Sequence, residues 1–134
     1  MTKPMKVLDA YAVMAYLEAE PGEEQVADLL RQAVREEVDL AMTVVNLGEV
    51  YYSIARTNSF EIAEQVLSEF TALPVQIIDV DWRLTHQAAV FKTGAAIAYG
   101  DCFSAALAYL MNCPVVTGDR EFVRLGQNVA IEWI

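Results

Sequence analysis

Residues 98–119, AYGDCFSAALAYLMNCPVVTGD, limit the fold more than any other stretch of the chain. Asp101 stands where a helix can begin, and apolar residues then repeat at the helical period for about three turns, to about Asn112. Pro114 ends that helix, and the apolar PVVT segment is typical of a short buried strand. The strand leads into a second acid, Asp119. A helix and a strand with an acid at each end suit a parallel α/β sheet, which gathers such residues above one edge.

The rest of the chain repeats this alternation of short strands and helices. Strands are expected at 5–8, 39–43, 75–79, 114–117 and 129–134. Helices are expected at 10–20, 23–37, 44–56 and 60–73, then from about 82 to 93, from 101 to about 112, and as a short turn at 119–125. This order predicts parallel βαβ units and an α/β fold, a Rossmann-like three-layer α/β/α sandwich with a parallel sheet.

Three helix ends have specific signals. Ser59 is a favoured N-cap for the helix that follows it, and either Asp79 or Asp81 can cap the next helix. Gly94 is expected just after that helix, in the left-handed conformation that glycine adopts easily. No GxGxxG follows the first strand and no GxxxxGK[ST] occurs, so neither a dinucleotide site nor a P-loop is indicated.

Length and composition suit one domain over residues 1–134, with 55% hydrophobic residues to build a core. No uninterrupted apolar run reaches the roughly 18–20 residues of a membrane span. Asp9 interrupts the apolar N-terminal segment, which argues against a signal peptide and for a cytoplasmic protein. We therefore expect Cys102 and Cys113 to be reduced thiols. His86 is the sole histidine, which excludes a His-rich metal site, and we expect it to be structural or at the surface.

The formal net charge of −10 repels nucleic acid at long range and argues against a simple DNA-binding module. A nuclease remains compatible with this charge, because a metal ion in an acidic site can bridge carboxylates and phosphates. A basic protein partner would also suit an acidic surface.

Three aspartates, Asp9, Asp101 and Asp119, each stand where a helix begins. Asp9 also follows the first strand, at the edge where α/β sheets place ligands. Each of the three has two interpretations. It is either an N-cap, a position that favours aspartate, or a site residue.

Glu49 differs because it lies inside a helix. Asn46, Glu49, Ser53 and Arg56 recur at spacings of three, four and three, which places them on one narrow polar stripe. The opposite stripe is apolar. The polar stripe faces either water or a polar cleft, and the sequence leaves both open.

The combination of the four acids is more informative than any member. Four converging carboxylates without a cation would repel one another, and some would stay protonated. A hard cation such as Mg²⁺ takes one or two direct carboxylates and leaves the others to hold waters. The chemistry that follows is phosphodiester hydrolysis, in which the metal lowers the pKa of a water and stabilises phosphate charge. Ser104 and Cys102 lie nearby in sequence, but nothing places a histidine beside either.

These segments resemble the PIN-domain proteins, in particular the VapC-type ribonuclease toxins of type II toxin–antitoxin systems. VLDAYAVMAYLEAEPG resembles the family's opening strand, first acid and first helix. TVVNLGEVYY resembles the segment with the helical Glu, and AYGDCFSAALAYLMNCPVVTGDREF resembles the third-acid helix and the TxD strand end.

The resemblance implies a Mg²⁺- or Mn²⁺-dependent endoribonuclease that cleaves RNA with a metal-activated water. Its catalytic, metal-site acids would be Asp9, Glu49, Asp101 and Asp119, with Asp9 and Asp101 as direct ligands, and Thr117 would support them from the strand end. The resemblance also implies a homodimer and inhibition by a cognate antitoxin whose tail covers the active site.

Tyr11 departs from the family pattern, because many relatives carry Ser or Thr two residues after the first acid. Arg56, Lys92 and Arg120 lie near the acids in the chain and are candidates for RNA contact, although an ordinary solvated surface charge is the preferred interpretation of each. The tyrosines at 11, 16, 51 and 52 could stack on bases, line a dimer contact or pack in the core.

Two other functions fit the same sequence. One is a non-catalytic PIN-like protein-interaction module that binds a basic partner. The other is a small-molecule phosphohydrolase that uses the same acids. A receiver domain is not indicated, because the chain lacks both an acidic pair ahead of a phosphoacceptor aspartate and a lysine at a late strand end.

Overall fold

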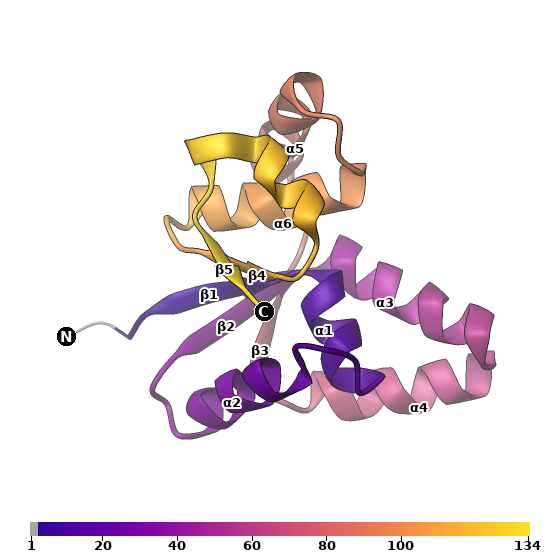
Figure 1. Cartoon of the computed structure of the whole chain (residues 1–134). Coiled ribbons are helices and arrows are strands. Elements are labelled where there is room, and N and C mark those ends of the chain that lie inside the picture. Colours follow the sequence, from indigo (N-terminus) through magenta and orange to yellow (C-terminus); the bar gives the residue numbers. More distant parts are fainter. Residues whose placement is uncertain (1–2) are drawn as a thin grey trace.

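The computed structural model describes residues 3–134, so the first two residues of the predicted domain lie outside the described part. Five parallel strands form one sheet in the order β3-β2-β1-β4-β5 (Figure 1). The strands are β1 Met5–Leu8, β2 Asp39–Thr43, β3 Val75–Ile78, β4 Val115–Thr117 and β5 Ile131–Trp133. The helices are α1 Ala10–Leu17, α2 Glu23–Val34, α3 Val44–Thr57, α4 Phe60–Thr71, α5 Trp82–Gly94, α6 Tyr99–Leu110 and the 3₁₀ segment η1 Arg120–Asn128.

The sheet separates two helical layers, which confirms the predicted three-layer α/β/α sandwich. Successive side chains of a strand point to opposite faces, so Leu8 packs against α1 to α4 while Val7 packs against α5 and α6. Figure 1 shows α1 to α4 below the sheet and α5, α6 and η1 above it. Because helices cover both faces, the central strands carry consecutive buried apolar residues, at 7–8 in β1, 40–42 in β2 and 115–116 in β4, rather than alternating ones.

The strand order creates a crevice between β1 and β4. From the central β1 the chain moves outward to β2 and β3, then crosses back to β4 and β5 on the other side. Connections therefore leave β1 and β4 in opposite directions, and open α/β sheets bind ligands at the carboxyl ends of two such strands. Asp9 follows β1 and Thr117 ends β4, so both lie at this crevice.

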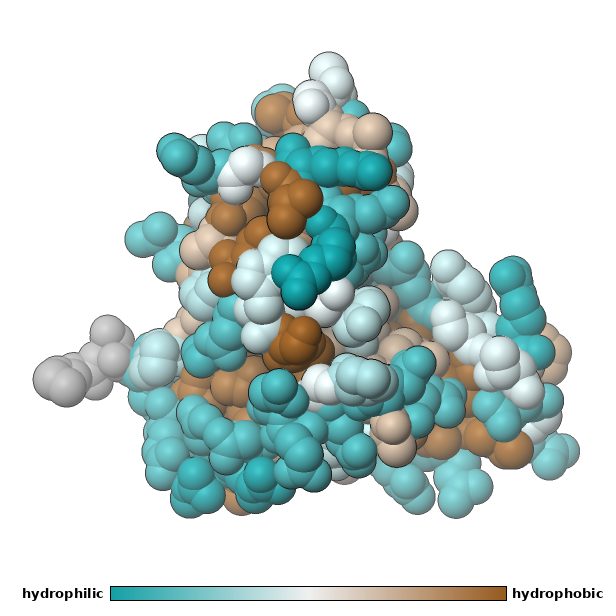
Figure 2. Space-filling view, viewed as in Figure 1, coloured by the Kyte–Doolittle hydropathy of each residue, from teal (hydrophilic) through white to brown (hydrophobic). Residues whose placement is uncertain are grey.

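Amphipathic sequence explains the lower layer. α2 buries Val26, Leu29, Leu30 and Ala33. Its outer face carries acids and arginines, and the corresponding surface in Figure 2 is largely hydrophilic. Hydrophobic side chains show more in the upper layer and along α3 and α4.

Two predicted helix caps are confirmed, and one predicted helix end is wrong. Ser59 and Asp81 are N-caps as expected, accepting hydrogen bonds from Ile62 N (3.1 Å) and Leu84 N (2.9 Å). The prediction for Gly94 is wrong, because it is the last residue of α5 and the chain leaves the helix through an extended Ala95.

The loop after α5 and the ends of α1 and α2 also differ from the prediction. After α5 the Lys92 ammonium donates to Ile97 O at 2.6 Å, and the chain leaves the helix without a left-handed residue. α1 and α2 stop short of their predicted ends, because non-glycine residues in the left-handed conformation follow them: Ala19 (φ 53°) and Glu36 (φ 61°).

The described residues also bear on the sequence predictions for a membrane span, the two cysteines and His86. No helix within residues 3–134 is long and apolar enough to cross a membrane. Cys102 is buried and Cys113 half-buried, and both are free thiols. His86 is exposed, with its ring centroid 5.4 Å from that of Trp82.

Replacing Ser59 by alanine should lower the free energy of unfolding by about 1 kcal/mol, because the N-terminus of α4 loses its cap. Urea unfolding followed by circular dichroism measures this change. The cap lies away from the crevice, so this variant also serves below as a control for general destabilisation. A loss above about 3 kcal/mol would contradict a simple capping role.

Candidate metal centre

Asp9 is both a helix cap and a buried acid with a free oxygen. Its side chain is 1% exposed, and Oδ1 accepts a hydrogen bond from Ala12 N at 2.8 Å. Its Oδ2 is buried and has no hydrogen-bond partner. A buried carboxylate oxygen left unpaired is costly, so one expects a ligand for it. The two interpretations of Asp9 are therefore compatible, since each uses a different oxygen.

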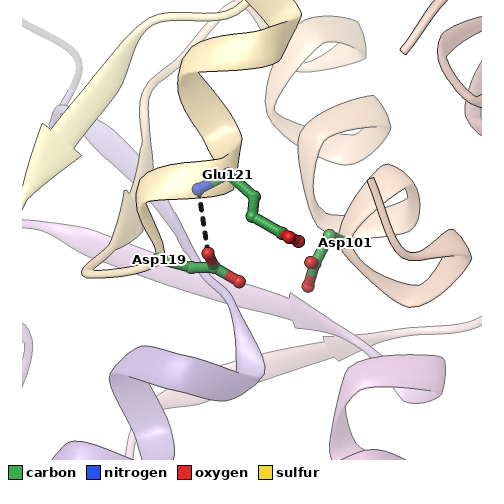
Figure 3. A group of neighbouring side chains, drawn as sticks. All are labelled: Asp101, Asp119 and Glu121. Atoms are coloured by element: carbon green, nitrogen blue, oxygen red, sulfur yellow. Dashed lines mark hydrogen bonds between the residues drawn. The ribbon is translucent and has the colours of Figure 1, made fainter. Parts of the chain in front are cut away.

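Asp101 meets Asp119 and Glu121 across the crevice (Figure 3). One carboxylate oxygen from each of the three lies within 4.8 Å of the others. The capping interpretation of Asp101 is wrong, because α6 begins at Tyr99 with Ala98 as its N-cap. Asp101 is the third residue of α6, and its carboxylate points out of the helix toward the other two acids.

Asp119 is a cap as well as a member of this group. Its Oδ1 accepts from Glu121 N at 2.9 Å, which starts η1. Its own N–H donates to the Thr117 hydroxyl at 3.0 Å. Thr117 is fully buried at the end of β4, so this hydrogen bond fixes the backbone of Asp119 to the strand end.

Glu121 is the site residue that the sequence reasoning missed. It is exposed, and Arg124 Nη1 lies 3.4 Å from its Oε1. The available signal was its place two residues after Asp119, in a stretch already expected to form a helical turn. Such a turn brings the two carboxylates to the same side of the strand end, as Figure 3 shows.

The polar stripe of α3 faces a cleft rather than open water. Asn46 is fully buried, and its Nδ2 donates to Glu49 Oε1 at 2.8 Å and to Gly100 O at 3.0 Å. Its Oδ1 accepts from the Thr43 hydroxyl, and its N–H donates to the same hydroxyl at 3.0 Å. Asn46 thus ties α3 to the start of α6 and fixes the direction of Glu49.

Gly100 allows this close approach. A Cβ added at Gly100 would lie 2.6 Å from Cδ and 2.7 Å from Oε1 of Glu49, well inside any normal contact. The Glu49 carboxylate therefore rests against the bare Cα that precedes Asp101. A glycine in the first turn of a helix costs stability relative to alanine, and here it makes room for an acid.

Burial and mutual repulsion raise the pKa of two of these acids. The pKa of Asp9 is raised to about 7, mainly by desolvation, with smaller contributions from the charges of Asp101 and Asp119; the Thr117 hydroxyl and Ala12 N–H oppose the shift. The pKa of Asp101 is also raised to about 7, by burial first and then by the charges of Asp119, Glu49 and Glu121.

Glu49, Asp101 and Asp119 open into a cavity of about 350 Å³. Its lining consists of Ala10, Tyr11, Met14, Glu20, Pro21, Glu49, Tyr52, Ser53, Asp101 and Asp119. Within residues 3–134, neither lysine nor arginine contributes to this lining. The carboxylates of the lining thus face no basic side chain within the lining, whereas Glu121, outside it, has Arg124 beside it.

This donor set fits a hard divalent cation. The ligand atoms on offer are carboxylate oxygens, which Mg²⁺ and Mn²⁺ prefer. A bound cation would give Asp9 Oδ2 a partner and would offset the burial and repulsion that raise the pKa values of Asp9 and Asp101. The structure brings Asp9, Glu49, Asp101 and Asp119 to one crevice, and their part in binding a metal stays a prediction.

The three basic residues considered for RNA contact lie outside the cavity lining. Arg56 places its Cζ 5.3 Å from the ring centroid of Tyr52, and Arg120 places its Cζ 5.0 Å from that of Trp133. Lys92 is bound to the Ile97 carbonyl. Their contact with RNA remains a prediction, and Arg56 borders the cavity through Tyr52.

Comparison with known proteins agrees with this arrangement. The PIN domain matches residues 6–128. Curated proteins yield no match. Among solved structures, a chain of the DNA-bound VapBC2 complex from Rickettsia felis has TM-score 0.80 and 21% identity, covering 97% of this chain and 98% of that one. A chain of DNA-bound VapBC from Salmonella typhimurium has TM-score 0.77 and 20% identity, covering 99% of this chain and 98% of that one.

A third similar structure is VapC20 of Mycobacterium tuberculosis, described as a sarcin–ricin loop-cleaving toxin. It has TM-score 0.72 and 16% identity, covering 90% of this chain and 95% of that chain. At these identities the likeness shows the shared fold alone.

Without divalent cations, stability should fall as pH rises. Asp9 and Asp101 have native pKa values near 7 and ordinary values near 3.8, so the native state binds more protons between these limits. The stabilisation is present at low pH and is lost as pH passes 7, by about 2–3 kcal/mol for each acid from pH 5 to 8. Urea unfolding in EDTA across this range measures it.

Asp9→Asn should flatten this pH dependence, because asparagine keeps the N-cap bond but carries no charge. Asp81→Asn is the matched control, since Asp81 is also an N-cap but is exposed. Its pH dependence should equal that of the wild type. Stability that rises with pH, or an equal effect of both variants, would contradict the crowding of buried acids.

Proposed function

Because the chain belongs to the PIN domain family, we propose that it is a Mg²⁺- or Mn²⁺-dependent endoribonuclease and the toxin of a toxin–antitoxin pair. The observation that carries this proposal is the convergence of carboxylates on the crevice between β1 and β4, with one buried oxygen of Asp9 left without a partner. A site of that kind suits a cation and a phosphate ester better than it suits an anion alone.

In this proposal each acid has a distinct part. Asp9 and Asp101 would be the direct ligands, because Asp9 Oδ2 is buried without a hydrogen-bond partner and the Asp101 carboxylate points toward Asp119 and Glu121. Glu49 and Asp119 would accept hydrogen bonds from waters bound to the cation, and Glu121 would add a further acceptor at the exposed side. Thr117 supports the set through the backbone of Asp119.

The bound cation would supply positive charge for the phosphate and lower the pKa of a water. The chain's own residues have other tasks. Asn46 holds Glu49 in one orientation, and Glu49 and Asp119 can accept hydrogen bonds from a water and direct it toward the scissile phosphorus. The protonated state of Asp9 and Asp101 near neutral pH would give way to the charged state once the cation is in place.

The VapBC structures that share this fold support a protein partner for this chain, a cognate antitoxin that blocks the crevice. The homodimer and the cytoplasmic location belong to the same proposal. VapC20 is described as cleaving the sarcin–ricin loop, an RNA target, and RNA is the substrate proposed here.

Cleavage of RNA by the isolated chain tests the proposal directly. The wild type should cleave a mixed-sequence RNA with Mn²⁺ or Mg²⁺ and should lose activity in EDTA. Asp101→Asn and Asp119→Asn should lose at least about a hundredfold in rate, since each removes an acid of the cluster. Ser59→Ala should keep its activity at a temperature where it remains folded.

Other outcomes point to the alternative functions. Hydrolysis of a chromogenic phosphate ester without RNA cleavage would favour a small-molecule phosphohydrolase. If the chain hydrolyses neither substrate with either ion, and Asp101→Asn still binds the same protein partner, the nuclease proposal is wrong and an interaction module is favoured.

Gly100→Ala should lower the affinity for Mn²⁺ without lowering the free energy of unfolding. The new Cβ displaces the Glu49 carboxylate, so Mn²⁺ affinity should fall by about 10–100-fold. The fold should tolerate it, because a flexible side chain can swing away and alanine favours a helix by about 0.5–1 kcal/mol. Gly48→Ala is the matched control, because nothing lies within 4 Å of a Cβ at that helical position.

Calorimetric titration with Mn²⁺ gives the affinities, and urea unfolding gives the stabilities. Asn46→Ala should lower the affinity by a similar factor and also cost about 1–3 kcal/mol, because the buried Thr43 hydroxyl loses its acceptor and the Gly100 carbonyl loses a donor. Equal Mn²⁺ affinity for Gly100→Ala and Gly48→Ala would show that Glu49 has no part in the metal site.

A further inference from the structure

We propose that Tyr11 and Tyr52 form a stacking site for an unpaired base of the RNA, on the rim of the acidic cavity. This inference rests on the proposed function, since it assigns recognition of the substrate at the same cavity. Both side chains belong to the cavity lining, where they stand beside Glu49, Asp101 and Asp119. Each exposes about half of its surface, 45% for Tyr11 and 50% for Tyr52.

Tyr11 is held in place by the strand end. A Cβ added at Gly118 would lie 2.9 Å from Cζ and 3.0 Å from Cδ1 of Tyr11, so the ring packs directly on the bare Cα of Gly118. Gly118 lies between Thr117 and Asp119, and the ring is therefore fixed relative to the acids. Position 11 thus carries a half-exposed aromatic ring that is packed against the end of β4.

Tyr52 approaches the cavity from the other side. It lies three residues after Glu49 on α3, which places both on the cavity face of the helix. The guanidinium of Arg56 lies 5.3 Å from its ring centroid, in a cation–π arrangement. The adjacent Tyr51 has a structural task instead, because its hydroxyl donates to Glu64 at 2.8 Å and joins α3 to α4.

The charge of the cavity explains why stacking is needed. Among residues 3–134, no basic side chain lines it, and the chain carries a net charge of −10. Ion pairs with phosphates therefore cannot supply most of the affinity for RNA. Stacking on an aromatic ring works for any base and does not depend on charge. A base inside a duplex hides its faces, so the ligand must be an unpaired segment.

The arrangement also assigns a role to Arg56. In the free protein its guanidinium rests against Tyr52, at the rim rather than inside the cavity. A base stacked on Tyr52 would bring its flanking phosphate toward this one cation. Binding should therefore depend on salt only weakly, with a slope near that of about one released counterion for a single strand.

The test uses a short single-stranded RNA that contains one 2-aminopurine, whose fluorescence is quenched when it stacks. Titration is carried out with the full chain in the Asp101→Asn background with Mn²⁺, where cleavage is slow. Tyr11→Ala and Tyr52→Ala should each weaken binding by about tenfold and reduce the quenching. Tyr11→Phe and Tyr52→Phe should stay within about twofold, because the ring remains.

Tyr109→Ala is the matched control, because Tyr109 is 49% exposed and lines cavities other than the acidic one. It should bind like its parent. The same RNA annealed to its complement should bind at least about tenfold more weakly than the single strand. The inference is wrong if the alanine variants at 11 and 52 bind as their parent does, if the phenylalanine variants are as weak as the alanine ones, or if the RNA does not bind.

Cleavage assays in the wild-type background separate this inference from the proposed function. If the wild type cleaves RNA, and Tyr11→Ala and Tyr52→Ala keep its kcat/KM and prefer single strands equally, only the stacking site is wrong. If the wild type never cleaves but binding and quenching depend on both rings, the nuclease proposal fails and the base-stacking site stands.

Discussion

Repulsion between carboxylates at the crevice between β1 and β4 is the constraint on which the rest of this structure depends. Burial of Asp9 and the proximity of Asp101, Asp119 and Glu49 raise pKa values toward neutrality. The fold carries this cost because the strand order directs Asp9 and Asp119 to the same edge of the sheet. The two apolar core clusters, one on each face of the sheet, provide the hydrophobic stabilisation that offsets the repulsion in the crevice.

Neutral residues keep the acids in place. The buried Asn46 joins Thr43, Glu49 and the start of α6 in one hydrogen-bond network. Gly100 and Gly118 leave out the Cβ atoms that would otherwise collide with Glu49 and with Tyr11. The site is thus assembled from four segments that are distant in sequence: the β1–α1 junction, α3, α6 and the β4–η1 junction. A cation that binds it would act on a set of ligands that the fold has already oriented.

Local signals were enough to predict much of the fold. Ser59 and Asp81 are caps whose partners lie three residues away, and the apolar strands stand between helices of regular period. The grouping of Asp9, Glu49, Asp101 and Asp119 followed from the sheet rule and from the family resemblance together. The errors concern interactions that a local pattern does not contain. Gly94 stays in α5, where the Lys92 ammonium binds the Ile97 carbonyl across the next loop, and α6 begins at Tyr99, where Asn46 binds the Gly100 carbonyl from 54 residues away.

The central claim, that these acids form a cation site, is tested most directly by thermal unfolding of the wild type and of Asp101→Asn, each with and without Mn²⁺ at pH 8. Crowded acids predict that the variant melts higher than the wild type without metal, because it loses one repelling charge. They also predict that Mn²⁺ at about 100 times its dissociation constant stabilises the wild type by about 2.7 kcal/mol and the variant far less. A wild type that ignores Mn²⁺, together with a variant that melts lower without metal, would contradict the claim.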